Sequence, residues 1–220
     1  MSIRCFLAIV MAGSLTLGSL AARPTVLGVV VAAHRARLNT TALTNGATVY
    51  DGDRFSTEAG GALRVQSGPA ILELAEASEV SVRYRANGAP GLVTELGKGT
   101  LIFSTARAAS LHVIALEASI RSVADTQTFA QVSVTGPREL RICALRGALQ
   151  FSYRGETETI AEGKTYRVIL DPPKENPEQG SRLAPIRWPK GFKIVIIGQG
   201  AAVLGLGIYE LLEPESPDRP

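Results

Sequence analysis

Residues 62–74 read ALRVQSGPAILEL, two short runs in which apolar and polar side chains alternate, joined by Ser67-Gly68-Pro69. Alternation with a period of two places successive side chains on opposite faces of a β-strand, and Gly with Pro favours a turn. This stretch therefore predicts a pair of antiparallel strands with one buried face.

The same alternation recurs throughout residues 25–171, with turn residues between the runs. Short strands at regular spacing, without a convincing amphipathic helix between them, favour an all-β domain, either a β-sandwich or a short β-helix-like stack. Further strands are predicted at 79–84, 100–104, 111–115, 130–134, 139–144, 148–153 and 165–170.

The N-terminus has the pattern of an export signal. Arg4 precedes an apolar stretch over residues 5–20, and small residues follow at Ala21 and Ala22. This order of basic, apolar and small residues predicts a secretory signal peptide over residues 1–22. Because the apolar run is slightly long for such a peptide, an uncleaved signal anchor is the alternative.

Near the C-terminus, residues 194–209 read IVIIGQGAAVLGLGIY and carry no charge. Gly198 and Gly200 resemble a dinucleotide-binding turn, but Val203 stands at the third glycine position and little chain follows for a second strand. Since about 20 apolar residues cross a bilayer, residues 192–212 are predicted to form a transmembrane helix. A buried helix of a globular domain is the alternative.

Small residues in that segment recur at a spacing of four. Gly198 with Ala202, and Ala201 with Gly205, are candidates for close helix packing and homo-oligomer formation, although small residues are common in membrane helices. A Pro-rich linker over 172–191 would join the domain to this helix, and 213–220 would form an acidic tail. Membrane lipids would then be partners of the helix.

The predicted location is the inner membrane, with the β-domain facing the periplasm. This orientation follows from the signal peptide, but it places Lys190 and Lys193 outside, where the positive-inside rule disfavours them. The net charge of +3 and pI of about 9.0 are mild, and no basic run with interleaved aromatics argues for nucleic-acid binding.

The cysteines give little indication of chemistry. Cys5 would leave with the signal peptide, so Cys143 could not form an internal disulfide and is interpreted as a buried or half-buried strand residue. A catalytic thiol is disfavoured because His34 and His112 lie far from it, and from each other, along the chain. We expect no cofactor and no metal site.

Several segments, in this order, resemble the FecR-type domain of bacterial envelope regulators: ATVYDGDRFST (47–57), AILELAEASEVSV (70–82), ELGKGTLIF (95–103), and LRGALQF (145–151) with TIAEGKTYRV (159–168). The resemblance implies an inner-membrane protein whose periplasmic β-domain receives a signal from an outer-membrane transporter. Family members control a sigma factor through an N-terminal cytoplasmic segment, whereas here a signal peptide is predicted at that place. Residues 123–131, VADTQTFAQ, also depart from the family pattern.

Two functions remain open. The first is a non-enzymatic envelope domain with a sensory, regulatory or scaffolding role, acting by binding a protein or envelope ligand. The alternative is an envelope hydrolase, which needs two carboxylates at a defined separation. Asp51 and Asp53 flank a glycine, but aspartates in such a turn usually stabilise the turn itself. Two other groups of carboxylates could be brought together by folding: Glu73 with Glu76, or Glu156 with Glu158 and Glu162.

Overall fold

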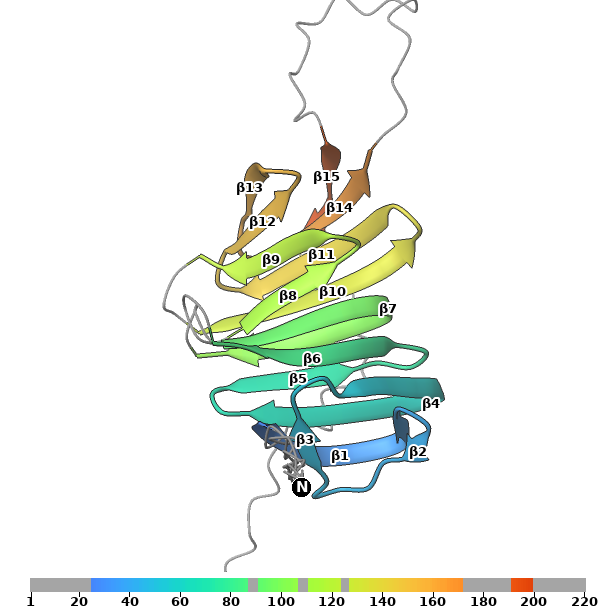
Figure 1. Cartoon of the computed structure of the whole chain (residues 1–220). Coiled ribbons are helices and arrows are strands. Elements are labelled where there is room, and N and C mark those ends of the chain that lie inside the picture. Colours follow the sequence, from blue (N-terminus) through green and yellow to red (C-terminus); the bar gives the residue numbers. More distant parts are fainter. Residues whose placement is uncertain (1–24, 87–90, 107–110, 124–126, 172–190, 200–220) are drawn as a thin grey trace, which may run out of the picture.

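The computed structural model describes residues 25–86, 91–106, 111–123, 127–171 and 191–199, and within these ranges the regular elements are all β-strands (Figure 1). The predicted all-β fold class is confirmed. The strands are β1 (Val26–Leu38), β2 (Thr41–Ala42), β3 (Thr48–Tyr50), β4 (Arg54–Ser67), β5 (Ala70–Leu74), β6 (Glu79–Arg85), β7 (Gly91–Thr105), β8 (Leu111–Ala115), β9 (Ala118–Ser122), β10 (Thr128–Gly136), β11 (Glu139–Arg146), β12 (Leu149–Tyr153), β13 (Glu156–Ile160), β14 (Lys164–Leu170) and β15 (Phe192–Gln199).

The strands form two layers that share long strands. The first half of β7 pairs with β6 and β8, and β9, β12 and β13 follow; we call this the β8 layer. The second half of β7 pairs with β5 and β10, and β11, β14 and β15 follow; this is the β10 layer. The β4 strand likewise pairs with both β6 and β5, while β1 runs along both parts of β4. The strands lie one above another as in a stack (Figure 1).

Each shared strand must bend where it passes from one layer to the other. In β4 the bend contains Gly60 and Gly61, and a Cβ at Gly61 would lie 2.7 Å from the carbonyl oxygen of Arg35 in β1. In β7 it contains Gly99, whose φ of +79° belongs to the left-handed region that favours glycine. The glycines of these turns therefore allow continuous strands to form two packed layers.

The core lies between the layers and is built from the inward side of each alternating strand. From the β10 layer, Val65, Leu72 and Phe103 lie in one cross-strand row and are buried. From the β8 layer, Val113 and Ile120 are opposite each other on β8 and β9 and are also buried. Burial of this apolar surface is the main stabilising contribution to the fold.

The predicted transmembrane helix over 192–212 is wrong for its first part, because Phe192–Gln199 form strand β15. This strand pairs antiparallel with β14, from Leu170 opposite Phe192 to Lys164 opposite Gln199. The Phe192 side chain is fully buried, with its ring centroid 4.9 Å from that of Phe151 in an edge-to-face arrangement. The sheet thus extends past Asp171, where the sequence placed the end of the domain.

The helix prediction failed because it rested on length and lack of charge, which a buried or edge strand also satisfies. In the part of the chain that the structure describes, no helix is long and apolar enough to cross a membrane. Of the predicted helix-packing residues, Gly198 lies in β15 opposite Thr165. Ala201, Ala202 and Gly205 lie outside the described residues, as do the predicted signal peptide (1–22), most of the predicted linker (172–190) and the acidic tail (213–220).

Candidate functional site

The Asp51-Gly52-Asp53 segment forms a turn in which both carboxylates accept backbone hydrogen bonds. The Tyr50 N–H donates to Asp53 Oδ2 at 2.7 Å, and the Tyr84 N–H donates to Asp51 Oδ1 at 2.8 Å. Gly52 has a φ of +89°, as the turn requires. The turn interpretation of these aspartates is confirmed: Asp53 closes the turn on Tyr50, and Asp51 attaches it to β6.

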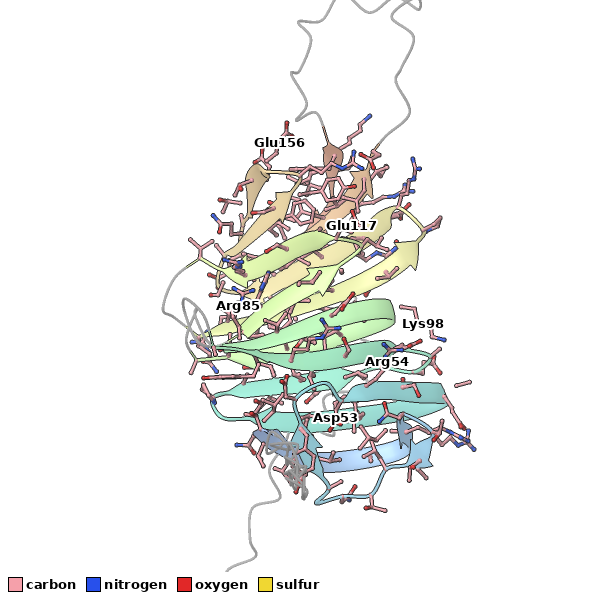
Figure 2. The ribbon with its side chains drawn as sticks, in the orientation of Figure 1. Asp53, Arg54, Arg85, Lys98, Glu117 and Glu156 are labelled. Atoms are coloured by element: carbon pink, nitrogen blue, oxygen red, sulfur yellow. The ribbon has the colours of Figure 1, made fainter. Side chains whose placement is uncertain are left out.

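The remaining candidate carboxylates lie in separate places. On β5, Glu73 faces Arg64, and in the following turn Glu76 Oε2 accepts the Gly60 N–H at 2.7 Å. By contrast, Glu156 and Glu158 lie on β13 at the other end of the stack, and Figure 2 shows Glu156 far from Asp53. In the first group, Glu73 is thus engaged by Arg64 and Glu76 by the Gly60 N–H; in the second, Glu156 and Glu158 are two residues apart on one strand.

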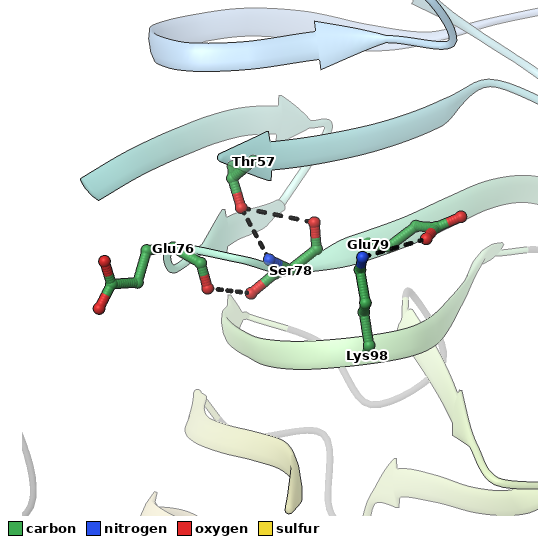
Figure 3. A network of polar contacts seen from close by, with 5 residues as sticks. All are labelled: Thr57, Glu76, Ser78, Glu79 and Lys98. Carbon is green, nitrogen blue, oxygen red and sulfur yellow. Dashed lines mark hydrogen bonds and ion pairs between the residues drawn. The ribbon is translucent and has the colours of Figure 1, made fainter. Parts of the chain in front are cut away.

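A buried polar network holds the corner where β4 and β7 bend (Figure 3). The fully buried Ser78 accepts the Thr100 N–H at its Oγ (2.8 Å), and its own N–H donates to Thr57 Oγ1 at 3.0 Å. Thr57 Oγ1 in turn donates to the carbonyl oxygen of Ala75 at 2.5 Å. A Cβ at Gly99 would collide with Ser78, so glycine is required there.

The corner network accounts for three of the segments that resemble the FecR-type domain. Thr57 ends the first segment, Ser78 lies in the second and Gly99 lies in the third, and all three meet at one corner. Beside them, Lys98 Nζ lies 4.0 Å from Glu79 Oε2 at the exposed surface. The hydrogen bonds of Thr57 and Ser78 are internal to the fold, which gives these residues a structural role.

A pocket of about 170 Å³ lies on the β10 layer, between β1, β4, β5 and β7. The cross-strand row Ala32–Arg64–Glu73–Ile102 passes through it. Alanines in the neighbouring positions leave space where larger side chains would fill the surface. The residues that line it, within the described ranges, are Ala32, Ala33, His34, Asn45, Ala62, Leu63, Arg64, Glu73, Leu74, Ala75 and Ile102.

The charged groups of this pocket are held in a mostly apolar surrounding. Arg64 Nε lies 3.3 Å from Glu73 Oε1, and the two side chains are only 23% and 12% exposed. Burial raises the pKa of the Glu73 carboxyl, and the positive charge of Arg64 opposes that effect without cancelling it. Apolar walls with a few fixed polar groups are typical of ligand sites, so this pocket is the candidate functional site.

Sequence reasoning identified Glu73 but not the pocket. Its members come from four strands that are adjacent only after folding, and alanine on the outward side of a strand carries no chemical signal. Cys143 is buried on β11 and accepts the Thr165 hydroxyl at 3.2 Å, which agrees with the interpretation of this thiol as a structural strand residue.

Comparison with known proteins gives few matches. No protein-family model matches the chain, and no curated protein matches it. The chain is similar to two crystal structures, at 1.65 and 2.50 Å resolution, of a protein from Parabacteroides distasonis ATCC 8503 that is provisionally described as an anti-sigma factor. The sequence identities are 12% and 11%, and the TM-scores are 0.44 and 0.45. The alignments cover 53% of this chain and 54% of that one, so the chain spans about half of the length of its structural neighbour.

Proposed function

We propose that this chain is an exported, non-enzymatic protein of the bacterial envelope that binds a protein partner in a sensory, regulatory or scaffolding role. The observation that carries the proposal is the apolar pocket with the Arg64–Glu73 pair on its wall. The pocket has room for an apolar side chain of a partner. The ion pair offers a fixed polar group that would orient the partner's backbone or a polar neighbour of that side chain.

The FecR-type identity is part of this proposal. Thr57, Ser78 and Gly99 are in contact at the corner between β4 and β7. Three of the segments that carry the resemblance therefore contribute residues to the same corner network, which supports the proposal. A domain of this kind receives its signal by contact with another protein. A surface pocket on a rigid sheet is suited to such contact.

We further propose that the domain faces the periplasm from the inner membrane. With Phe192–Gln199 in the sheet, the uncharged residues 200–209 would span only about 15 Å as a helix, half of the hydrocarbon core. The apolar stretch over 5–20, retained as an uncleaved anchor, is therefore the membrane attachment that we propose. Mass spectrometry of the N-terminus of the protein from membranes tests this: a chain that begins after Ala21 or Ala22 would contradict the anchor.

The pocket is tested by in vivo photocrosslinking from position 32, at its wall, in cells that produce the full chain. We expect a crosslinked adduct of discrete mass that disappears when Ala62→Leu fills the pocket. The matched control is Ala161→Leu at an exposed site after β13, which should leave the adduct unchanged. Equal loss of the adduct in both variants, or persistence in both, would show that the pocket is not the contact site.

A further inference from the structure

A second cluster of polar side chains lies on the outer face of the β8 layer, away from the pocket. His112 of β8 is opposite Arg121 of β9, and Ser119 is two residues before Arg121 on the same face. Arg85 of β6 donates from Nη2 to His112 Nδ1, and His112 Nε2 lies 2.7 Å from Ser119 Oγ. Arg85 lies on the side of the stack seen in Figure 2. We call these four residues the His112 cluster.

The hydrogen bonds fix the protonation of the imidazole. A guanidinium group only donates, so His112 Nδ1 must accept from Arg85 and the ring proton must be on Nε2. Nε2–H then donates to Ser119 Oγ, which leaves the Ser119 hydroxyl proton free to donate elsewhere. Burial, together with the positive charges of Arg121 and Arg85, lowers the pKa of His112 to about 4, which keeps the ring neutral near pH 7.

The positive charge of this face is not neutralised by its neighbours. Within the described ranges, Arg83, Arg85 and Arg121 have no carboxylate within 4.0 Å. Arg83 is in the same cross-strand row as His112, with Val93 of β7 between them. On β6 and β7 the acidic side chains of this face are Glu95, opposite Ser81, and Glu79, whose Oε2 lies 4.0 Å from Lys98 Nζ. Elsewhere on the surface, in contrast, Arg167 and Arg154 each form an ion pair with a carboxylate.

We infer that Arg85, Ser119 and Arg121 form a binding site for a phosphate group, with His112 as the residue that positions Arg85. Arg85 and Arg121 contribute charged donors, and the Ser119 hydroxyl contributes an O–H that His112 does not occupy. A phosphate dianion matches them because it has several acceptor oxygens and guanidinium groups bind it in a bidentate manner. The site belongs to a different layer from the pocket and does not depend on the protein-binding function proposed above.

The phosphate can be free in solution or part of an anionic lipid headgroup, and the chemistry of recognition is the same. In either case the negative charge of the phosphate would offset the positive charges of Arg85 and Arg121. Bound phosphate should therefore raise the pKa of His112, because the charges that now disfavour its protonation would be compensated. The second histidine, His34 on the other layer, serves as an internal reference.

The test is an NMR titration of the histidine side chains in the full chain with inorganic phosphate at constant ionic strength. We expect the His112 resonances to shift in a saturable manner and the pKa of His112 to rise by about one unit, while His34 is unaffected. Arg121→Gln should weaken phosphate binding about tenfold or more, whereas Arg141→Gln, at an exposed position of β11, should not change it. Matching thermal melts of the two variants would exclude unfolding as the cause.

A parallel measurement distinguishes the two sources of phosphate. Co-sedimentation with phosphatidylglycerol vesicles, absent with phosphatidylcholine and lost in Arg121→Gln, would assign the site to a lipid headgroup. Saturable binding of inorganic phosphate without such co-sedimentation would assign it to free phosphate. The inference is overturned if neither probe binds, if His34 responds as His112 does, or if Arg121→Gln binds phosphate as well as Arg141→Gln.

Discussion

Replacement of Phe192 by alanine tests the strand that the sequence presented as part of a membrane helix. The Phe192 side chain is 0% exposed and its ring packs edge to face on Phe151, at 4.9 Å between centroids. Truncation of a fully buried phenylalanine leaves a cavity and typically costs about 3–5 kcal/mol of unfolding free energy. For a domain of this size, each kcal/mol lowers the melting temperature by about 2–4 °C, so Phe192→Ala should lower it by roughly 6–20 °C.

The measurement is thermal and denaturant unfolding of the full chain, followed by far-ultraviolet circular dichroism. The matched control is Ile196→Ala on the same strand, whose side chain is 61% exposed and which should change the unfolding free energy by less than about 1 kcal/mol. If residues 192–212 instead formed a helix in lipid, both substitutions would leave the unfolding of the β-domain unchanged. A loss below about 1 kcal/mol for Phe192→Ala would therefore refute the register of β15.

Three further predictions concern the corner, the His112 cluster and the sheet edge. Ser78→Ala removes the acceptor of the buried Thr100 N–H and should cost about 1–3 kcal/mol in denaturant unfolding, and a loss under 0.5 kcal/mol would contradict a structural role for the network. The pKa of His112 falls from 6.5 to about 4 on folding, so the unfolded chain binds more protons than the folded chain between these pH values. The unfolding free energy should therefore decrease as pH falls from about 6.5 toward 4. His112→Gln should flatten that part of the stability profile, and an unchanged slope would refute the pKa assignment. The edge strand β15 exposes the side chains of Ile196 and Ile197. If the chain self-associates through this edge, lysine at both positions should shift the protein to monomer in analytical ultracentrifugation. An unchanged distribution of species would exclude the edge as the interface.

The strand content of the fold could be predicted because alternation directly reports which side chains face a core. The runs at 62–66 and 70–74 form β4 and β5 with the expected turn between them, and Leu63 and Leu74 are opposite each other on the buried side. The prediction failed at β15, where apolar residues follow one another without alternation. An edge strand beside β14 and a membrane helix can have the same composition, and only the pairing partner distinguishes them.

The candidate site could not be predicted, for a different reason. Glu73 was one of several acidic residues of equal weight in the sequence, and nothing local marks it as the one that pairs with Arg64 on the wall of the pocket. That information lies in the register of β1, β4, β5 and β7, which brings together residues from 32 to 102 of the chain. The polar role of Ser78 was equally hidden, since its partners Thr57 and Thr100 come from strands on either side of it.

The assignment of β15 also removes a conflict in the expected membrane topology. The conflict arose because Lys190 and Lys193 were taken as the outer flank of a membrane helix, where the positive-inside rule disfavours basic residues. Lys193 instead lies in β15 opposite Ile169 of β14, within the folded sheet, so it no longer bears on orientation. In the proposal of an exported domain, the expected orientation therefore rests on the signal-like pattern of the N-terminal sequence.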